Sequence, residues 1–213
     1  MNGIFITGSN TEVGKTTVAV EIARRLSEER KVRVRKPVET DCPIVNKKYA
    51  PRDATALSNA CGNIEPLLVV CPFCFALEAS AEKASADAGE SLTLESLVVA
   101  CNAGIGNDFS LVEGAGGFYS PIAEKVLNAD LASELNLPLV IVVRDELGAI
   151  SQALLTIDAA HKYNLRVACV VLNRIESNTL SNLEALKVYT KVPLVCFSLA
   201  DLERFWVDIK ELI

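Results

Sequence analysis

The chain has 213 residues, of which half are apolar and 23% are charged, and its formal net charge is −6. A chain of this length and composition can bury a sizeable core, and we expect one domain spanning residues 1–213. The acidic balance, without a clustered Lys/Arg face, excludes nucleic acid as the expected partner, because binding a polyanion needs such a face. We therefore expect small-molecule ligands.

Three further features predict a cytoplasmic protein with no membrane partner. Seven cysteines, an odd number spread from Cys42 to Cys196, do not form the pattern of a small disulfide-stabilised secreted module. The first residues lack the basic region and cleavage pattern of a signal peptide. The longest aliphatic run, Leu137 to Val143, contains Pro138 and is much shorter than the about 20 residues that a membrane span needs.

Strands and helices are predicted to alternate along the chain. Aliphatic or β-branched runs predict strands at residues 3–7, 32–36, 109–112, 139–143, 167–172 and 192–196. Apolar residues spaced by three and four predict helices around Val18, Ile22 and Leu26, and around Leu147, Ile150, Leu154 and Ile157. Residues 37–52 show no periodicity, so we predict a mobile loop there.

The predicted fold class is α/β: a doubly wound, mostly parallel sheet with helices on both faces. Strands that are apolar at nearly every position, such as 140–143, suit a sheet that is covered on both sides. In such folds ligands bind beyond the carboxyl ends of the strands. Candidate site residues should therefore follow the predicted strands.

The strongest motif is the run from Gly8 to Thr17, which follows a predicted strand and opens a predicted helix. This is the context of a phosphate-binding loop, in which backbone N–H groups surround the phosphates. Lys15 adds a positive charge, and Thr16 offers a hydroxyl ligand to Mg²⁺. Five residues separate Gly8 from Gly14, one more than in the common Walker pattern. A glycine-rich helix cap is the alternative, but strand, Gly-Lys-Thr-Thr and helix in succession favour a P-loop.

Two more motifs end predicted strands. In Leu111–Gly117 the carboxylate of Glu113 is followed by glycines, which suits magnesium and a close approach of the backbone to a phosphate. In Lys36–Thr40 a lysine ends the second strand, and Asp53 opens the next helical pattern. Taken alone, Lys36 or Asp53 would be interpreted as a solvated side chain.

Together with Leu147–Ile150 and Leu172-Asn173, these motifs closely resemble the dethiobiotin synthetase family of P-loop ligases, over about residues 3 to 175. The resemblance implies a magnesium-dependent enzyme of biotin biosynthesis that uses ATP as co-substrate. Such an enzyme joins CO2 to 7,8-diaminopelargonic acid and closes the ureido ring of dethiobiotin, releasing ADP and phosphate. The resemblance also implies a homodimer with shared active sites.

The resemblance assigns roles to the matching positions, with Lys15 and Lys36 as catalytic residues. The implied magnesium ligands are Thr16, Asp53 and Glu113. The implied nucleotide-binding residues are Glu12, Val13, Gly14, Lys15, Thr16, Thr17, Glu113, Gly114, Ala115, Gly116 and Asn173. The implied substrate-binding residues are Thr11, Lys36, Thr40, Gly117, Gly148, Ala149 and Ile150.

Three segments depart from the family pattern. Asp41 stands where the family usually has glycine, and we expect it to face solvent or Lys47. Residues 77–82 replace a stretch that tends to hold prolines and a histidine, which affects the shape of that loop. Residues 193–201 lack the family's usual glycine and proline, which affects nucleotide preference.

Other interpretations remain as alternatives. A regulatory ATPase of the partition or iron-protein type, acting as a nucleotide-driven dimer switch, would carry a lysine near Gly8, where this chain has Ser9 and Asn10. Ligases that amidate cobalamin precursors need a glutaminase domain, for which 213 residues leave no room. Cys71 and Cys74 have metal or redox spacing without a matching second pair, so we predict two buried or half-buried thiols. His161 is expected on a helix surface.

Overall fold

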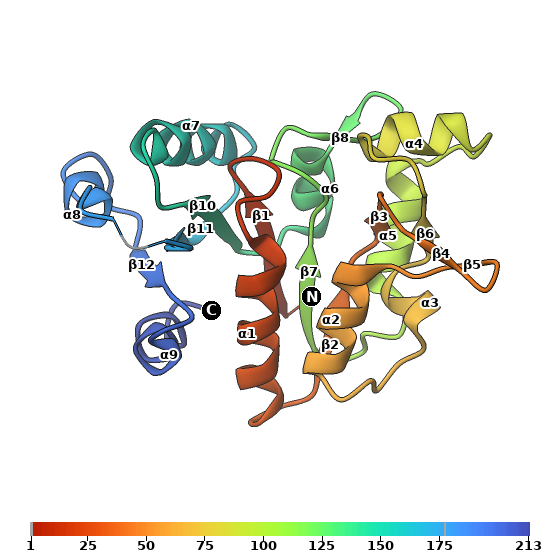
Figure 1. Ribbon diagram of the computed structural model, residues 1–213, viewed down its shortest axis with the longest axis horizontal. Coiled ribbons are helices and arrows are strands. Elements are labelled where there is room, and N and C mark those ends of the chain that lie inside the picture. The colour runs from red at the N-terminus through yellow and green to blue at the C-terminus, as the bar shows by residue number, and fades with distance from the viewer. Residues whose placement is uncertain (1, 177) are drawn as a thin grey trace.

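The computed structural model describes residues 2–176 and 178–213, and a six-stranded parallel sheet runs through these residues (Figure 1). Its strands are β1 (Gly3–Gly8), β2 (Val32–Arg35), β7 (Phe109–Glu113), β10 (Leu139–Arg144), β11 (Val167–Asn173) and β12 (Leu194–Phe197). The spatial order is β12-β11-β10-β1-β7-β2. Each strand lies within two residues of its predicted bounds.

Helices cover both faces of the sheet, as predicted. One face carries α1 (Lys15–Ser27), α2 (Arg52–Ala60), α3 (Leu67–Val70) and α9 (Leu202–Ile209). The other carries α4 (Ala81–Asp87), α5 (Leu94–Asn102), α6 (Asn128–Leu135), α7 (Ala149–Lys162) and α8 (Asn182–Leu186). Strand β10 shows why its sequence is apolar throughout, because Ile141 belongs to one core while Val140 and Val142 belong to the other.

The strand order places β1 between β7 and β10, at the point where the chain reverses its direction across the sheet. The loop that leaves β1 therefore opens into the crevice where doubly wound folds bind ligands. Figure 1 shows this loop at the upper end of α1, near the end of β7. Among the residues that the structure describes, no helix combines the length and apolarity needed to cross a bilayer.

Residues 37–52, predicted as a mobile loop, contain regular structure that the sequence did not indicate. The segment contains β3 (Val38–Glu39), which pairs in parallel with β6 (Phe73–Cys74). It also contains the hairpin of β4 (Ile44–Val45) and β5 (Lys48–Tyr49). Strands of two residues are too short to show a periodic pattern, and β3 depends on a partner far along the chain. A second short hairpin joins β8 (Pro121–Ala123) to β9 (Val126–Leu127).

Candidate active site

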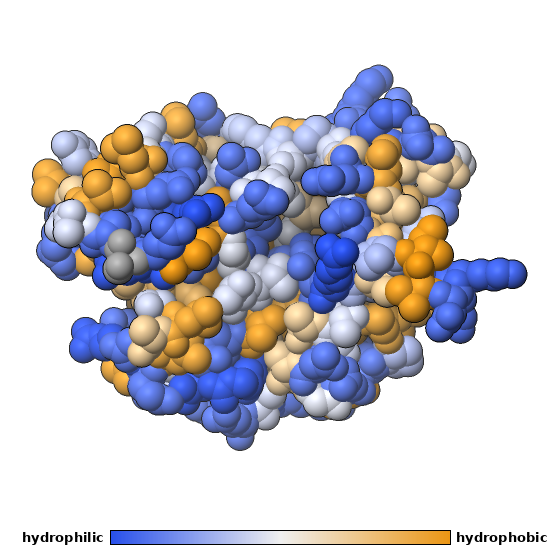
Figure 2. Space-filling model, in the orientation of Figure 1, coloured by the Kyte–Doolittle hydropathy of each residue, from blue (hydrophilic) through white to orange (hydrophobic). Residues whose placement is uncertain are grey.

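A cavity of about 620 Å³ opens at the carboxyl ends of β1, β2 and β7. This volume is typical of small-molecule sites, which span roughly 300–1,000 Å³. Figure 2 shows a hollow in the middle of this face, bordered by hydrophilic side chains. The predicted site residues that line the cavity are Thr11, Glu12, Gly14, Lys15, Thr16, Thr17, Lys36, Thr40, Asp53, Ala115 and Gly116.

The phosphate-binding loop is fixed by its contacts with β11. Gly14 precedes α1 with a φ of +86°, and a Cβ at this position would lie 2.0 Å from Nδ2 of Asn173. Asn173 ends β11 and donates from Nδ2 to the carbonyl oxygen of Val13 at 2.9 Å. Lys15 donates from Nζ to the carbonyl oxygen of Asn10 at 3.1 Å. Only glycine meets both the φ and the space at residue 14.

The ammonium group of Lys15 loses its proton at a lower pH than an ordinary lysine does. Burial, and then the nearby ammonium of Lys36, lowers the pKa of Lys15 to about 8. A triphosphate bound by this loop would add negative charge beside this group and raise its pKa again. Nucleotide binding near pH 8 should therefore draw a proton onto Lys15.

We expect a non-hydrolysable ATP analogue to take up as much as about half a proton per site at pH 8, because a group with that pKa is half deprotonated there. Isothermal titration in buffers of different ionisation enthalpy measures this uptake. The control is Lys15→Arg, which keeps the charge on a group that does not titrate in this range. Equal proton uptake by the two proteins would contradict the assignment to Lys15.

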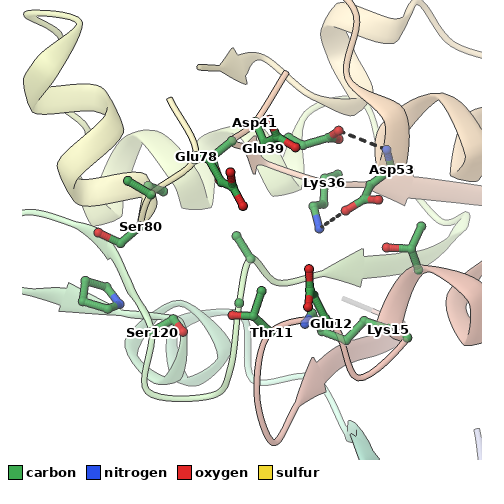
Figure 3. A pocket seen from close by; sticks show the side chains of 18 of the residues that line it. Thr11, Glu12, Lys15, Lys36, Glu39, Asp41, Asp53, Glu78, Ser80 and Ser120 are labelled. Carbon is green, nitrogen blue, oxygen red and sulfur yellow. Dashed lines mark hydrogen bonds and ion pairs between the residues drawn. The ribbon is translucent and has the colours of Figure 1, made fainter. Parts of the chain in front are cut away.

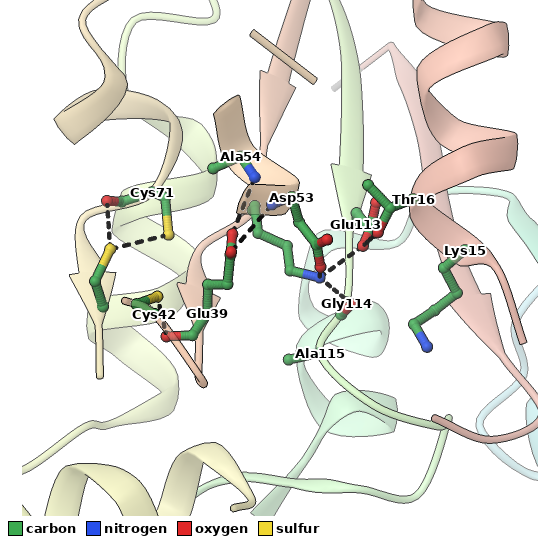
Figure 4. Close-up of polar contacts among 12 residues, drawn as sticks. Lys15, Thr16, Glu39, Cys42, Asp53, Ala54, Cys71, Glu113, Gly114 and Ala115 are labelled. Atoms are coloured by element: carbon green, nitrogen blue, oxygen red, sulfur yellow. Dashed lines mark hydrogen bonds and ion pairs between the residues drawn. The ribbon is translucent and has the colours of Figure 1, made fainter. Parts of the chain in front are cut away.

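Lys36 lies between the two predicted metal-binding carboxylates. Figure 4 shows these carboxylates, on Asp53 and Glu113, near each other. Its Nζ is 2.6 Å from Oε1 of Glu113 and 2.9 Å from Oδ2 of Asp53. The hydroxyl of Thr16 donates to the same Oε1 of Glu113 at 2.9 Å. Lys36 and Glu113 are 3% and 0% exposed, so this ion pair is shielded from water.

The charges in this cluster stabilise one another. Burial alone would lower the pKa of Lys36, but Glu113 and Asp53 outweigh burial and raise it. Burial alone would raise the pKa of Asp53, but Lys36 and the Thr16 hydroxyl hold it below its usual value. The lysine and the aspartate are therefore both charged at neutral pH.

Thr16, Asp53 and Glu113 form a donor set that fits Mg²⁺, which prefers one or two carboxylates together with phosphate and water oxygens. Oε2 of Glu113 is buried and has no hydrogen-bond partner in the described structure, so one carboxylate oxygen is unused. No group of three His, Cys, Asp or Glu side chains within residues 2–176 and 178–213 has the spacing of a metal site. The fit therefore depends on the Thr16 hydroxyl as the third donor.

Several cavity residues were not predicted as site residues. They are Glu39, Asp41, Glu78, Ala79, Ser80, Ala81, Ser120 and Pro121 (Figure 3). Glu39 lies inside the Lys36–Thr40 motif and Asp41 follows it, so their place at the end of a predicted strand could have marked them as candidate site residues. Residues 78–81 lie in the segment that departs from the family pattern. Ser120 and Pro121 follow the glycines after β7 at a distance that no motif marks.

Asp41 faces solvent, as one of the two expectations had it, but its charged neighbour is Arg52 and not Lys47. Its Oδ2 lies 3.5 Å from Nη1 of Arg52, and its side chain is 58% exposed. The partner is thus Arg52 rather than Lys47, because Lys47 lies in the turn of the β4–β5 hairpin with a positive φ. The exposed fraction agrees with the expectation that Asp41 faces solvent.

The remaining predicted residues fall into two groups. Val13, Glu113, Gly114, Gly117 and Asn173 are not among the lining residues. Some of them hold the loops that line the cavity: Asn173 Nδ2 donates to the Val13 carbonyl at 2.9 Å, and Glu113 Oε1 accepts from the Thr16 hydroxyl at 2.9 Å. Gly148, Ala149 and Ile150 open α7 and are not among the residues that line this cavity. Helix α7 is joined to the loop after β1 by a hydrogen bond that Ser9 Oγ donates to Gln152 Oε1 at 2.8 Å.

Cys71 and Cys74 are free thiols, with their sulfur atoms 3.5 Å apart. Cys71 is buried and Cys74 is half-buried, as predicted. His161 lies exposed on α7, also as predicted. None of the three side chains lines the cavity described above.

Comparison with known proteins identifies the family. A family model described as an AAA domain matches residues 2–197. The ATP-dependent dethiobiotin synthetase BioD of Vesicomyosocius okutanii is 47% identical over 213 residues, which cover 100% of this chain and 97% of that protein. The chain belongs to the dethiobiotin synthetase family. The ATP-dependent dethiobiotin synthetase BioD of Ruthia magnifica is 44% identical, over 100% of this chain and 99% of that protein.

Membership of this family makes the chain an ATP-dependent ligase, as the P-loop and the strand-end motifs predicted. A plasmid partition protein of Borrelia burgdorferi superposes with a TM-score of 0.60 and 13% identity, over 100% of both chains. At this identity the likeness shows the fold alone. It confirms the P-loop type of α/β fold.

Proposed function

We propose that the chain is a cytoplasmic, single-domain enzyme that converts 7,8-diaminopelargonic acid, CO2 and ATP into dethiobiotin, ADP and phosphate. The observation that carries the proposal is the position of Lys36. Its ammonium reaches the same cavity as the P-loop lysine, from the end of a different strand, and is held there by Glu113 and Asp53. One positive charge thus serves the nucleotide, and a second is available to another anion.

The reaction needs two anions side by side. One amine of the substrate attacks CO2 and forms a carbamate. A carbamate oxygen then attacks the γ-phosphorus of ATP, and ADP leaves. The second amine attacks the carbonyl carbon of the resulting carbamic phosphoric anhydride, so that the ring closes and phosphate leaves. Lys15 would hold the phosphates, while Lys36 would bind the carbamate and the transferred phosphoryl group.

The other site residues would serve binding rather than bond making. Thr16, Asp53 and Glu113 would hold Mg²⁺, which when bound neutralises charge on the β- and γ-phosphates. Thr11, Thr40 and Gly117 would contact the substrate. Glu12, Thr17 and the glycine-rich turn after Glu113 would surround the nucleotide.

Asn173 is proposed to contact the adenine. Because its amide nitrogen is bonded to the Val13 carbonyl at 2.9 Å, its amide oxygen is the atom left to accept a hydrogen bond from the adenine amino group. This arrangement would favour a base with a donor at that position.

A product assay tests the function. We expect purified protein to form dethiobiotin, detected by mass, when it is given diaminopelargonic acid, bicarbonate, Mg²⁺ and ATP. If the protein hydrolyses ATP when the diamine is left out, and forms no dethiobiotin when the diamine is present, the result would instead support a nucleotide switch of the partition type. That outcome would reject the proposed reaction while leaving the ATP site in place.

The same proposal includes a homodimer with shared active sites. Gly148, Ala149 and Ile150 do not line the chain's own cavity, yet they open α7, and a helix start leaves backbone N–H groups without partners inside the helix that suit a carboxylate. The carboxylate at the far end of the substrate would bind this helix start on the partner subunit. Two-fold symmetry then gives two composite sites.

Subunit mixing tests the shared site. We expect Lys15→Ala and Gly148→Glu to be inactive alone, the first at the phosphates and the second because its carboxylate repels the substrate tail. After random exchange, about a quarter of wild-type activity should return, because each mixed dimer has one site with both halves intact. The checks are that each variant folds and that subunits exchange. Demonstrated exchange with no recovered activity would show that each chain binds its substrate alone.

A further inference from the structure

The first turn of α2 is capped by a residue from a different element. Its N-cap position is occupied by Pro51, whose side chain makes no capping hydrogen bond. Instead, the carboxylate of Glu39 in β3 accepts hydrogen bonds from the backbone N–H groups of Asp53 at 3.0 Å and Ala54 at 2.9 Å (Figure 4). A helix start leaves such N–H groups without partners inside the helix. Glu39 supplies the cap from fourteen residues away in the sequence.

Glu39 is itself held firmly. Its carbonyl oxygen accepts hydrogen bonds from the N–H of Phe75 at 3.0 Å and from the thiol of Cys42 at 3.4 Å. Its residue is only 6% exposed, although its carboxylate borders the cavity (Figure 3). The β3–β6 pair therefore gives the cap a fixed position relative to the sheet.

One of the two capped residues is the proposed metal ligand. Asp53 gives its backbone N–H to Glu39 and turns its carboxylate toward Lys36, at 2.9 Å. Its side chain is 39% exposed, so packing fixes it only in part, and its direction depends on the backbone together with the ion pair to Lys36. In metal sites, residues that orient the ligands typically change metal affinity when they are replaced.

We propose that Glu39 is a positioning residue for the magnesium site, because its carboxylate fixes the first turn of α2 and thereby aims Asp53 into the cavity. The inference rests on the proposed function, since it takes Asp53 as a metal ligand. Glu39 itself touches neither metal nor substrate. It acts through the backbone of residues 53 and 54.

The test is the affinity of Mn²⁺, used as a probe of the magnesium site, for the protein saturated with a non-hydrolysable ATP analogue. Glu39→Ala should weaken Mn²⁺ binding by about 10-fold or more, the usual effect of removing a residue that orients a ligand. Affinity for the metal-free nucleotide should change less than about twofold, because Lys15 and the loop N–H groups remain. Electron paramagnetic resonance counts free and bound Mn²⁺ directly, without any turnover.

Two further variants separate positioning from capping. Asp201→Ala removes another acidic cap, which accepts from Arg204 N at 3.2 Å at the start of α9. It should lower stability to a similar degree and leave Mn²⁺ affinity unchanged. Adding Glu39→Ala to Asp53→Asn should produce little loss beyond that of Asp53→Asn alone, since the residue being aimed no longer binds the metal.

The outcomes are distinct. Unchanged Mn²⁺ affinity in Glu39→Ala, with wild-type protein binding the metal, would overturn the inference and leave the metal site standing. Fully additive losses in the double variant would also overturn it, because Glu39 would then act independently of Asp53. Wild-type protein that binds no Mn²⁺ beside the nucleotide would overturn the proposed metal site and this inference with it.

Discussion

Lys36→Met is expected to lower dethiobiotin formation by at least about 10²–10³-fold while the protein still binds ATP, because a preorganised charge is lost where negative charge develops. Lys15 and the loop N–H groups still hold the nucleotide. The measurements are product by mass and nucleotide affinity by equilibrium binding. Lys36→Arg is the control, because it keeps the positive charge and should retain part of the activity.

The contacts of Lys36 add a second consequence. Without its ammonium, Glu113 remains fully buried beside Asp53 with no cation between them. Removing one partner of a buried pair typically costs about 3–5 kcal/mol, so Lys36→Met should melt earlier than wild type without metal. Mg²⁺ with nucleotide should restore much of the loss. Lys36→Met protein that is fully active, or that folds but binds no ATP, would show that the role assigned to Lys36 is wrong.

The structure confirms the predicted positions of those motifs that lie at the ends of strands. The P-loop is continuous in the sequence, so its position between β1 and α1 follows from local pattern alone. Lys36, Asp53 and Glu113 lie far apart in the sequence but meet in space, because β2 and β7 are adjacent parallel strands whose carboxyl ends share one edge.

The features that sequence reasoning missed depend on long-range pairing. Glu39 has its role only because β3 runs beside the start of α2, which no periodicity reveals. The two-residue strands β3 and β6 likewise exist through their pairing with each other, Val38 with Phe73 and Glu39 with Cys74, rather than through propensity. The β4–β5 hairpin is local, but its strands are too short to show a pattern. The prediction of a mobile loop at residues 37–52 missed these strands because a segment without periodicity can still have regular structure.

Glu65 is a further residue that the sequence does not mark, and Glu65→Ala is expected to lower the free energy of unfolding by about 3–5 kcal/mol. Its carboxylate binds Arg35 at 2.8 and 3.0 Å, through both guanidinium NH2 groups. Arg35 lies in β2 and is 0% exposed, with the carbonyl oxygens of Val34 and Ala103 as its other acceptors. Arginine stays protonated, so the variant would bury an uncompensated charge.

For a chain of this length the expected loss corresponds to a decrease in Tm of roughly 6–20 °C, which thermal denaturation measures. Asp87→Ala is the matched control, because Asp87 pairs with Lys83 at 3.1 Å on the surface and should change Tm little. Replacing both residues of this pair, as in Arg35→Met with Glu65→Leu, should recover much of the stability, because Arg33, which also pairs with Glu65 at 3.0 Å, keeps Asp108 as a partner at 2.8 Å. If the Tm shift of Glu65→Ala is no larger than that of Asp87→Ala, the buried charge of Arg35 does not depend on Glu65 for its stabilisation. Because Arg35 ends β2 and Lys36 follows it, a large Tm shift with full activity at low temperature would further show that this pair stabilises the strand without setting the position of Lys36.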